Sequence, residues 1–587
     1  MAAAHRSSIW SYRDTPIVHL LVGAAVCFFV LSPALFTPWG FGPDFTNHLW
    51  LVWQQSVAIS NHGHPTIYLQ QPGGILEPFY GFYGGTLYAV VGTFGALVGT
   101  AHVYALYVVS YAGAFAMAYG GMWWLGRQIG LSRWVSHLPA FVTVTAAYYL
   151  TDAYARGAWP ELVALSAVPL FVAGGAALIR GPWGWGSVSL FLLGTVALTG
   201  SHNITLLWSA IAIGPTALVF WLVLGKARPS FRRIAATAGL MLLGIGINAW
   251  FLLLDLRHSG DTQAWTQNIA YLKVFSNTLY FDNVGNVLDP LRQTPGLSTT
   301  YGLTIAAPVA AFVFGLVLTS MSWPSVRGAG RPLRALWLVL MAAMTVLVVL
   351  LVMPGSWWVS IGAPFTDIQF PYRLAGWLLI AVALQLAVSL RFARGLGGAR
   401  RQVAFILAAA LIVATVAQAA GQMYSAPRLH GETNGNIHPR VEAFMYGPTT
   451  PPQTFYDPYS YSDSSEPIVE TPPKRIVYLP VPEAGGTRSE MPVDLGRDRS
   501  PIATNIAAGP YVVAISGMKL VGRTPGGAMV VAPEGRGGNS QLVVHADAGA
   551  IATIGTVVSI LCLIGVLALV GTLAVRSWVQ NRRRPTG

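Results

Sequence analysis

The strongest constraint on this chain is a succession of long apolar runs that contain almost no charge. Only 10% of the 587 residues are Asp, Glu, Lys or Arg, and 54% are hydrophobic, whereas a typical soluble domain has about 25% charged residues. Apolar runs of about 20 residues cross a bilayer as helices. The sequence therefore excludes an ordinary soluble enzyme, a disordered chain and a coiled coil. It predicts an α-helical polytopic membrane protein.

About twelve runs are candidates for transmembrane helices, if some short ones are allowed. A basic leader with Arg6 and Arg13 precedes the first run, and no small-residue cleavage site follows it, so we expect a retained first helix. The stretch 83–101, rich in Gly and aromatic residues, is expected to stay on the outer side as a juxtamembrane or re-entrant segment. The twelve runs are 16–36, 103–126, 138–151, 160–179, 186–200, 203–225, 235–255, 302–323, 335–353, 374–392, 403–423 and 549–575.

The net charge of +13 has a topological explanation, because cytoplasmic loops of membrane proteins collect Lys and Arg. The basic clusters all fall on one side if 83–101 does not cross, which predicts cytoplasmic N- and C-termini. A charge-poor outer face lacks the clustered Lys and Arg that bind the phosphates of nucleic acid. Cys27 and Cys562 lie in apolar runs at opposite ends of the chain, so a disulfide framework is not expected. The clusters are Arg127 and Arg133, 226–233, 327–334, 391–401 and 576–584.

This topology divides the chain into three parts. Residues 1–424 form a multi-span membrane domain, 425–548 an extracytoplasmic domain, and 549–587 a final transmembrane helix with a basic cytoplasmic tail. The extracytoplasmic part opens with a stretch dense in Pro, Tyr, Ser and Thr. In its later segment 510–532, hydrophobic residues alternate with others as in short strands, and Gly and Pro stand between these runs as in turns. This pattern predicts a small outward-facing β-containing domain. The outer loops of the membrane domain are 37–102, 152–160, 257–301 and 355–373.

Asp44 and Glu77 are the only acids in the first outer loop, and no Lys or Arg lies between Arg13 and Arg127. Asp44 stands in GPDFTNHLW, where a turn or a helix cap would explain it. Alternatively, partial desolvation at the membrane surface would make this carboxylate basic enough to activate a hydroxyl. His48 lies one helical turn onward and would face the same way.

A second outer loop, TDAYARGAWPELVAL, contains Asp152, Arg156 and Glu161. Pro160 suits a first helical turn, which would place Glu161 near the positive N-terminus of a helix. One interpretation is that these charges form an ion pair that only stabilises the loop. Three charges at a membrane boundary in so charge-poor a chain also indicate a polar cavity.

Two further polar positions are predicted on the outer side. His202, in TGSHNITLLW, would be explained by an interhelical hydrogen bond, or it would take part in a site. FTDIQFPYRLAGW offers Gln369 and Arg373 ahead of a helix, where the arginine would either snorkel or clamp a phosphate with its planar fork. The positive-inside bias favours the phosphate role. The sequence has no GxxxxGK[ST] nucleotide loop and no HExxH zinc pattern.

In order, EPFYGFYGGTLYAV, ARGAWPELVAL, the SHN turn and IQFPYR resemble the bacterial membrane proteins called 6-pyruvoyl-tetrahydropterin-synthase-related. That family is similar in layout to the GT-C superfamily of integral-membrane glycosyltransferases. The resemblance covers about Asp44 to Arg373. It implies a GT-C-like fold in the bacterial inner (plasma) membrane, a polyprenyl-phosphate-linked sugar donor, a cell-envelope glycan or lipid acceptor, and an active site on the outer side.

By this resemblance Asp44 corresponds to the essential first-loop acid, Arg156 and Glu161 to the second-loop charges, and Arg373 to a ligand of the lipid phosphate. We therefore expect Asp44, Glu161 and His202 to act in catalysis, and Arg373 and Arg156 to bind the donor phosphate. Many GT-C enzymes have paired acids in the first loop, whereas Phe45 follows Asp44 here, which leaves dependence on a divalent cation open. No other cofactor is expected. The substrate-binding candidates are His48, Asp152, Trp159, Gln369 and Tyr372.

Two alternatives belong to other classes of protein. About twelve spans and polar residues near the membrane also suit a transporter or flippase of a lipid-linked glycan. The candidate polar residues gather at the outer boundary instead of the bilayer midplane, which favours the enzyme. An enzyme-like scaffold that has lost activity and assists envelope assembly is the third reading.

Overall fold

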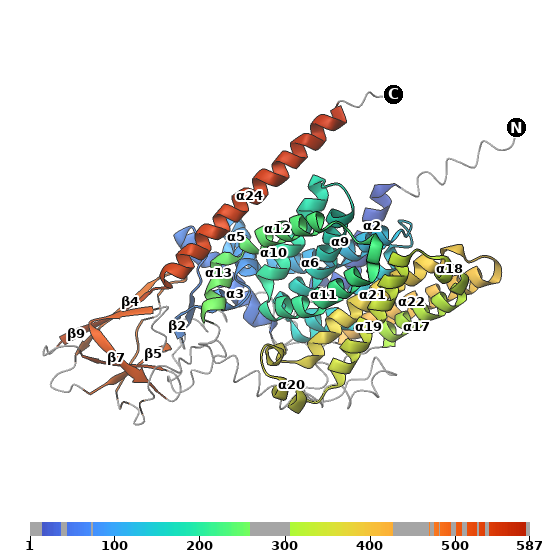
Figure 1. Cartoon of the computed structure of the whole chain (residues 1–587). Coiled ribbons are helices and arrows are strands. Elements are labelled where there is room, and N and C mark those ends of the chain that lie inside the picture. Colours follow the sequence, from blue (N-terminus) through green and yellow to red (C-terminus); the bar gives the residue numbers. More distant parts are fainter. Residues whose placement is uncertain are drawn as a thin grey trace.

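The computed structural model describes residues 15–36, 44–71, 74–258, 306–425 and, apart from short gaps, 473–582. It contains a bundle of helices, a small β domain at one side, and a long final helix that starts beside the β domain (Figure 1). Nearly all of the predicted outer loop 257–301 and the stretch dense in Pro, Tyr, Ser and Thr lie outside the described residues. The predicted fold class, a polytopic helical membrane protein with a small β-containing domain, is confirmed.

The helices differ widely in length. Four short helices connect longer elements: α4 (Phe79–Phe82), α8 (Ala147–Leu150), α18 (Trp323–Gly328) and α20 (Gly355–Ile361). The longer helices are α2 (Pro16–Phe36), α3 (Phe45–His62), α5 (Gly85–Val98), α6 (Val103–Ile129), α7 (His137–Val144), α9 (Trp159–Arg180), α10 (Trp185–Ser201), α11 (Asn203–Leu224), α12 (Phe231–Gly246), α13 (Ala249–His258), α17 (Ala306–Met321), α19 (Arg331–Val352), α21 (Leu374–Phe392), α22 (Gly398–Ser425) and α24 (Gly549–Arg582).

Fewer helices than the twelve predicted runs are long enough to cross a membrane. Among the described residues, eight are long and apolar enough, and α12 with α13 makes a ninth if this pair, bent by 84°, is one span. Helices α10 and α17 are apolar but shorter. The run 138–151 is not one helix, because extended backbone at Ala146 separates α7 from α8. Helix α5 has 14 residues, about 21 Å at 1.5 Å per residue, and is too short to cross the ~30 Å core upright.

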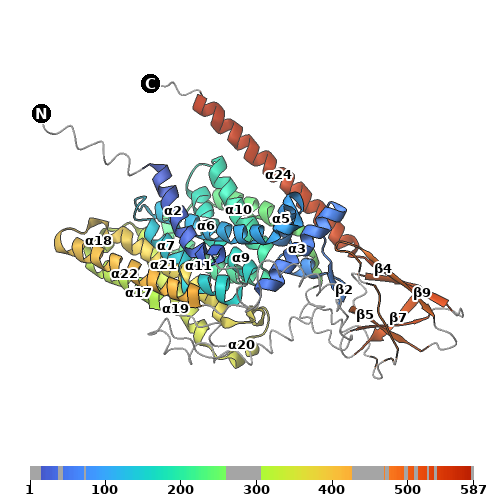
Figure 2. The same cartoon turned by 180° about the vertical axis from the view of Figure 1, so that it is seen from behind.

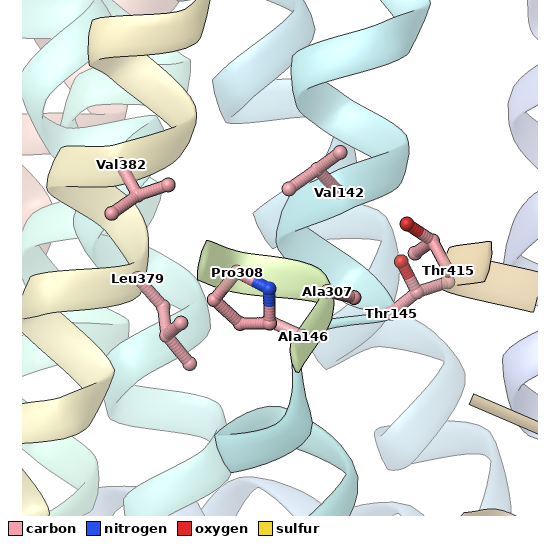
Figure 3. A pocket seen from close by; sticks show the side chains of 8 residues that line it. All are labelled: Val142, Thr145, Ala146, Ala307, Pro308, Leu379, Val382 and Thr415. Carbon is pink, nitrogen blue, oxygen red and sulfur yellow. The ribbon is translucent and has the colours of Figure 1, made fainter. Parts of the chain in front are cut away.

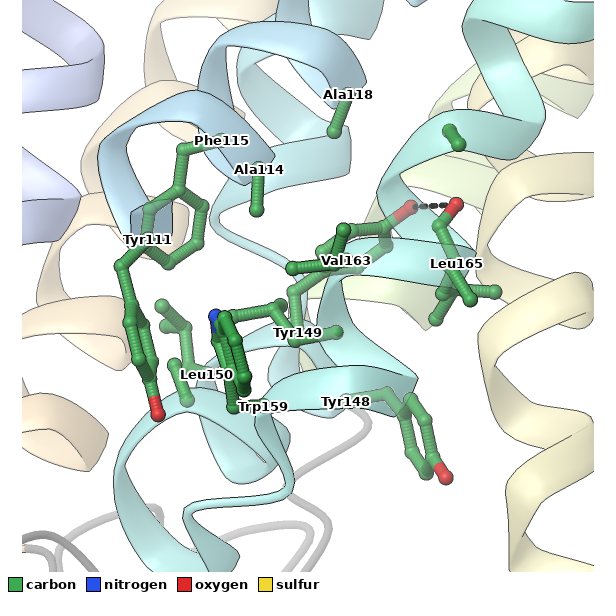
Figure 4. Close-up of a cluster of buried hydrophobic side chains, with 14 of the residues drawn as sticks. Tyr111, Ala114, Phe115, Ala118, Tyr148, Tyr149, Leu150, Trp159, Val163 and Leu165 are labelled. Atoms are coloured by element: carbon green, nitrogen blue, oxygen red, sulfur yellow. Dashed lines mark hydrogen bonds between the residues drawn. The ribbon is translucent and has the colours of Figure 1, made fainter. Parts of the chain in front are cut away.

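Helix α9 is the centre of the bundle and packs between α6 and α10. Side chains from α6, α8 and α9, among them Tyr149 and Trp159, form a buried layer, with the Tyr149 hydroxyl bonded to the Leu165 carbonyl (Figure 4). The helices approach closely through glycine. A Cβ on Gly121 of α6 would lie 2.3 Å from the backbone nitrogen of Leu170 in α9. Small residues at such contacts are typical of helix packing in membranes.

Basic residues lie together at one end of the bundle. The cytoplasmic loops predicted from the sequence contact one another there through arginine side chains. The candidate site residues lie at the opposite ends of these helices, where α9 and α21 begin. These contacts are Arg233 with the carbonyls of Ile179 and Gly181, Arg331 with that of Val223, and Arg400 with that of Met321.

The β domain contains two sheets. One has the strand order β3-β5-β8-β7 and the other β4-β9-β6. Only β3 and β5 pair in parallel; the other described pairs of the domain are antiparallel. The strands are β3 (Ile476–Val477), β4 (Arg488–Asp494), β5 (Ile502–Ala507), β6 (Val513–Ser516), β7 (Met518–Arg523), β8 (Ala528–Pro533) and β9 (Asn539–Ala546).

The β domain packs against the segment of the membrane domain between α3 and α5. A hairpin of β1 (Leu69–Gln71) and β2 (Gly74–Glu77) contacts β5, and Tyr68, Leu76, Phe82 and Leu254 share one hydrophobic core with the β strands. Helix α24 then runs antiparallel to α13 and α12, where the Trp250 backbone N–H donates to Ser559 Oγ at 2.8 Å. Figure 2 shows the same arrangement from behind, with the β domain beside β2 and α3 and far from α17, α18 and α22.

Candidate active site

Four buried charged side chains form one network at the end of the bundle where α9 and α21 begin. Arg156 Nη1 lies 2.7 Å from Asp152 Oδ1 and 3.0 Å from Glu161 Oε2. Arg373 Nε lies 3.1 Å from the same Glu161 oxygen, and the Tyr148 hydroxyl donates to Glu161 Oε1. Each of the four charged side chains is at most 6% exposed. The structure thus brings together the two loops that the sequence analysis singled out separately.

The local sequence explains how three of these charges meet. Residues Thr151–Arg156 form a π-helical turn, η2, and such turns are frequent at functional sites. Gly157, with φ of +72°, ends this turn in the left-handed region that glycine adopts without strain. Pro160 then occupies the first turn of α9 and places Glu161 at its N-terminus. The sequence RGAWPE therefore turns the chain sharply and directs Arg156 and Glu161 toward each other.

Arg373 enters the network from the IQFPYR segment. The segment forms two 3₁₀ turns, η6 (Phe365–Ile368) and η7 (Pro371–Arg373), and α21 starts directly afterwards. Gln369, between them, has a φ of +62°, which is uncommon for a residue other than glycine and is found mostly at functional sites. Arg373 Nη1 also donates to the Ile368 carbonyl at 3.2 Å, so the guanidinium is held from both sides.

Asp44 lies at the edge of this network and is held by its backbone. Its N–H donates to the Arg156 carbonyl at 3.0 Å, and its own carbonyl accepts from the His48 N–H at 3.0 Å as α3 begins. The carboxylate is half-buried, does not cap α3, and makes no hydrogen bond or ion pair within the described residues. Burial raises the pKa of Asp44, while the positive charges of Arg156 and Arg373 oppose the shift.

Burial weakens the negative side of the network. Burial, followed by the negative charge of Glu161, raises the pKa of Asp152 well above its ordinary value despite its contact with Arg156. Asp152 Oδ2 is buried without a hydrogen-bond partner. Because its ionisation is opposed in this way, Asp152 balances the charges of Arg156 and Arg373 less well than an exposed aspartate would. Positive charge that is incompletely balanced in a buried setting favours an anionic ligand.

Both candidate histidines are buried next to the charges. His48 Nδ1 is 2.7 Å from the Tyr88 hydroxyl, and burial lowers the pKa of His48 to about 3. His202 caps α11, where its Nδ1 accepts from the Thr205 backbone N–H at 3.2 Å and lies 2.7 Å from Thr205 Oγ1. The interhelical hydrogen bond expected for His202 is therefore replaced by a helix cap.

The remaining candidates have different surroundings. Trp159 is fully buried and donates its indole N–H to Ser110 Oγ at 2.8 Å, so it supports the site from within the core. The Tyr372 ring lies under Arg156 at 5.4 Å, a cation–π contact, and is 4% exposed. Gln369 is half-buried in the loop that presents Arg373. Stacking of Trp159 or Tyr372 on a sugar remains a prediction.

Sequence reasoning missed two neighbours of the site. Tyr148, which binds Glu161, is one of 23 tyrosines and lies inside an apolar run, so nothing in the sequence distinguished it. Asp255 accepts from Asn203 Nδ2 at 2.8 Å, and Asn203 also donates to the Phe82 carbonyl at 2.7 Å. A single acid within the apolar segment 249–256 was the available signal for Asp255.

A small apolar pocket lies deeper in the bundle, between α7, α17, α21 and α22 (Figure 3). It leaves no room for a water molecule, so it is a packing gap and not a substrate site. Within the part of the chain that the structure describes, no three His, Cys, Asp or Glu side chains gather as metal ligands. The pocket is lined by Val142, Thr145, Ala146, Ala307, Pro308, Leu379, Val382 and Thr415.

No protein-family model matches the chain, and no curated protein matches its sequence. Solved structures resemble it weakly. The mycobacterial arabinofuranosyltransferase AftD is 16% identical, with 70% of this chain and 27% of AftD covered at a TM-score of 0.45. The archaeal oligosaccharyltransferase AglB from Archaeoglobus fulgidus, solved with an inhibitory peptide and a dolichol-phosphate, is 15% identical, with 78% of this chain and 62% of AglB covered at a TM-score of 0.44. The chain thus spans about a quarter of AftD and less than two thirds of AglB.

Proposed function

We propose that this protein is an integral-membrane glycosyltransferase that moves a sugar from a polyprenyl-phosphate donor to a glycan or lipid acceptor at the outer side of the bacterial inner membrane. One observation carries the proposal: a half-buried acid, Asp44, which forms no ion pair with any residue that the structure describes, lies beside two buried arginines that Glu161 holds in place. This arrangement combines a base with an anion site. The resemblance of the EPFYGFYGG, RGAWPELVAL and IQFPYR segments to GT-C-like proteins points to the same chemistry.

Each arginine has more N–H donors than its contacts within the network use. The contacts above use Nη1 of Arg156, and Nε and Nη1 of Arg373. A guanidinium has five N–H donors, and no contact with a described residue uses Nη2 of either arginine, so we assign these groups to a ligand oxygen. Because the carboxylates fix both planes in advance, little reorganisation is needed when charge develops on a leaving phosphate.

The proposed reaction is an inverting displacement. An acceptor hydroxyl oxygen forms a bond to the anomeric carbon of the sugar, and the bond from that carbon to the lipid phosphate oxygen breaks. The hydroxyl proton moves to the carboxylate of Asp44, and the phosphate leaves as an anion paired with Arg373 and Arg156. Glu161 orients the arginines, and His202 orients a substrate hydroxyl. No step is routed through a metal ion.

The direct test compares wild type with Asp44→Asn in lipid nanodiscs supplied with labelled polyprenyl-phosphate sugars and candidate acceptors. Removing a general base costs about 10²- to 10⁴-fold in rate, so we expect transfer to fall by at least about a hundredfold. The matched control is Glu490→Gln, an exposed acid of the β domain, which should leave transfer unchanged. Transfer at the wild-type rate in Asp44→Asn would remove the base from the mechanism. Labelled lipid that crosses liposomes chemically unchanged would favour a transporter instead.

A further inference from the structure

Tyr83 lies between the two buried histidines of the site. Its ring is parallel to that of His48, with an interplanar angle of 8° and centroids 6.2 Å apart. It meets the His202 ring edge-on, at 88° and 5.4 Å. Tyr83 is half-buried, whereas His48 and His202 are 5% and 1% exposed. The rings of Phe79 and Tyr88 also adjoin Tyr83, at 5.6 and 6.5 Å, so the segment EPFYGFYGG supplies a ring that is fixed by its neighbours and adjoins both imidazoles.

Hydrogen bonds orient both imidazoles. Because the Thr205 backbone N–H can only donate, His202 Nδ1 accepts and carries no proton, and the neutral ring holds its proton on Nε2. His48 uses Nδ1 for the Tyr88 hydroxyl, and its pKa of about 3 keeps it neutral at ordinary pH. The described hydrogen bonds of both rings thus use Nδ1, and Nε2 remains for a ligand.

This group of three rings adjoins the charged network. The His48 backbone is bonded to Asp44, and the charges of Glu161, Arg373 and Arg156 act on His202. Because the charges of both arginines act on His202, we take these rings as the neighbours of a sugar joined to a phosphate at Arg156 and Arg373. One face of a sugar ring presents C–H bonds, which suit the negative face of an aromatic ring, while its hydroxyls need fixed polar partners.

We propose that Tyr83, His48 and His202 form the sugar-binding wall of the donor site. The Tyr83 ring packs on the C–H face of the transferred sugar, and the two Nε2 atoms bind its hydroxyls, with that of His202 donating. This inference rests on the proposed function, and it assigns selectivity for the sugar to residues separate from the arginines that bind the phosphate.

The test measures binding of two probes to the full chain in nanodiscs: polyprenyl phosphate without sugar, and a panel of polyprenyl-phosphate pentoses and hexoses. We expect wild type to bind at least one sugar-bearing lipid about two- to tenfold more tightly than the bare lipid, the scale of other aromatic contacts. Tyr83→Ala should abolish this gain and leave binding of the bare lipid unchanged. Tyr83→Phe should retain the gain, and so should Tyr478→Ala, a half-buried tyrosine of the β domain.

His202→Asn tests the imidazole separately, because asparagine still caps a helix but lacks the Nε2 donor. We expect an unchanged melting temperature and a reduced sugar-dependent gain. Equal binding of bare and sugar-bearing lipids by wild type would overturn the inference and leave the phosphate site standing. Equal weakening of both probes in Tyr83→Ala would make Tyr83 structural and also overturn it. Failure of wild type to bind any lipid phosphate would overturn the proposed function itself.

Discussion

Arg156 holds the buried network together, since it contacts both Asp152 and Glu161. Replacing both partners of a buried ion pair with apolar groups is often tolerated, whereas removing one partner leaves an uncompensated buried charge. The stability of this region therefore depends on completeness of the network more than on any single contact. The same completeness keeps the guanidinium planes fixed for a ligand.

Arg156→Met should lower the free energy of unfolding by about 3–5 kcal/mol, because Glu161 and Asp152 lose their shared cation. Thermal unfolding in detergent measures this loss. The control is Arg488→Met, which breaks an ion pair of the β domain whose side chains are 63% and 49% exposed and which should change stability by less than about 1 kcal/mol. Equal effects of the two substitutions would show that the buried network contributes no special stability.

The acid side of the pH–rate profile should report Asp44. A base acts when ionised, and burial raises the pKa of Asp44, so kcat/KM should fall with decreasing pH at a higher pH than an ordinary aspartate, near 3.9, would give. Arg373 lowers this pKa, so Arg373→Gln should shift the midpoint further upward as well as slow the reaction. An unchanged midpoint in Arg373→Gln would separate Asp44 from the titrating group.

The sequence identified the charged residues of the site because charge is scarce in this chain. Asp44, Arg156, Glu161 and Arg373 stood out against a composition with 10% charged residues, and the structure places them in one neighbourhood. The sequence did not distinguish Tyr83 or Tyr148. Tyrosines are common at membrane interfaces, and their importance here comes from the residues they meet in space.

At the scale of elements, some runs predicted as single helices are interrupted by a polar residue or by a residue with extended backbone. The run 235–255 divides into α12 and α13 at Asn248, whose Nδ2 donates to Thr199 Oγ1 at 2.6 Å and to the Val196 carbonyl. The mean hydropathy of the run changes little with one polar residue, so it predicts a single span. The bend depends on a tertiary hydrogen bond to α10, which a sequence pattern does not contain.

Two adjacent glycines of α6 give a matched test of helix packing. A Cβ at Gly121 would lie 2.3 Å from the backbone of α9, whereas a Cβ at Gly120 meets nothing within 4 Å. Gly120→Ala should be neutral or stabilising by up to about 1 kcal/mol, because alanine favours helix. Gly121→Ala should destabilise by about 1–3 kcal/mol, because α6 and α9 must move apart. Melting temperatures of the two variants in detergent decide this, and equal values would contradict the close contact.

At the scale of the whole molecule, the β domain is continuous with the membrane domain. Its hydrophobic core includes Tyr68, Leu76 and Phe82 from the segment between α3 and α5, the same segment that presents Tyr83. The sequence predicted the β strands from their alternation but not this docking, because elements that contact each other, such as β2 and β5, are more than 400 positions apart. A ligand that moves the β domain would therefore also act on the aromatic side of the site.

Leu254 is the residue through which α13 joins this shared core, and its neighbour Leu256 provides a control. Leu254 is fully buried in the core with the β strands, whereas Leu256 is 77% exposed on the same helix. Leu254→Ala should weaken docking by about 2–5 kcal/mol through the cavity it leaves, and Leu256→Ala should not. Hydrogen exchange at the backbone amides of β2 and β5 measures the docking directly.

Loss of exchange protection in Leu254→Ala should be accompanied by slower sugar transfer, because Phe82 and Tyr83 are adjacent in the chain and Gly81 packs on Leu254. The charged network is held by η2, η7 and the first turn of α9 instead, so binding of bare polyprenyl phosphate should stay close to the wild-type level. Unprotected β2 and β5 together with wild-type transfer would show that docking of the β domain and alignment of the aromatic wall are independent. Reduced binding of the bare lipid would instead extend the influence of the β domain to the arginines.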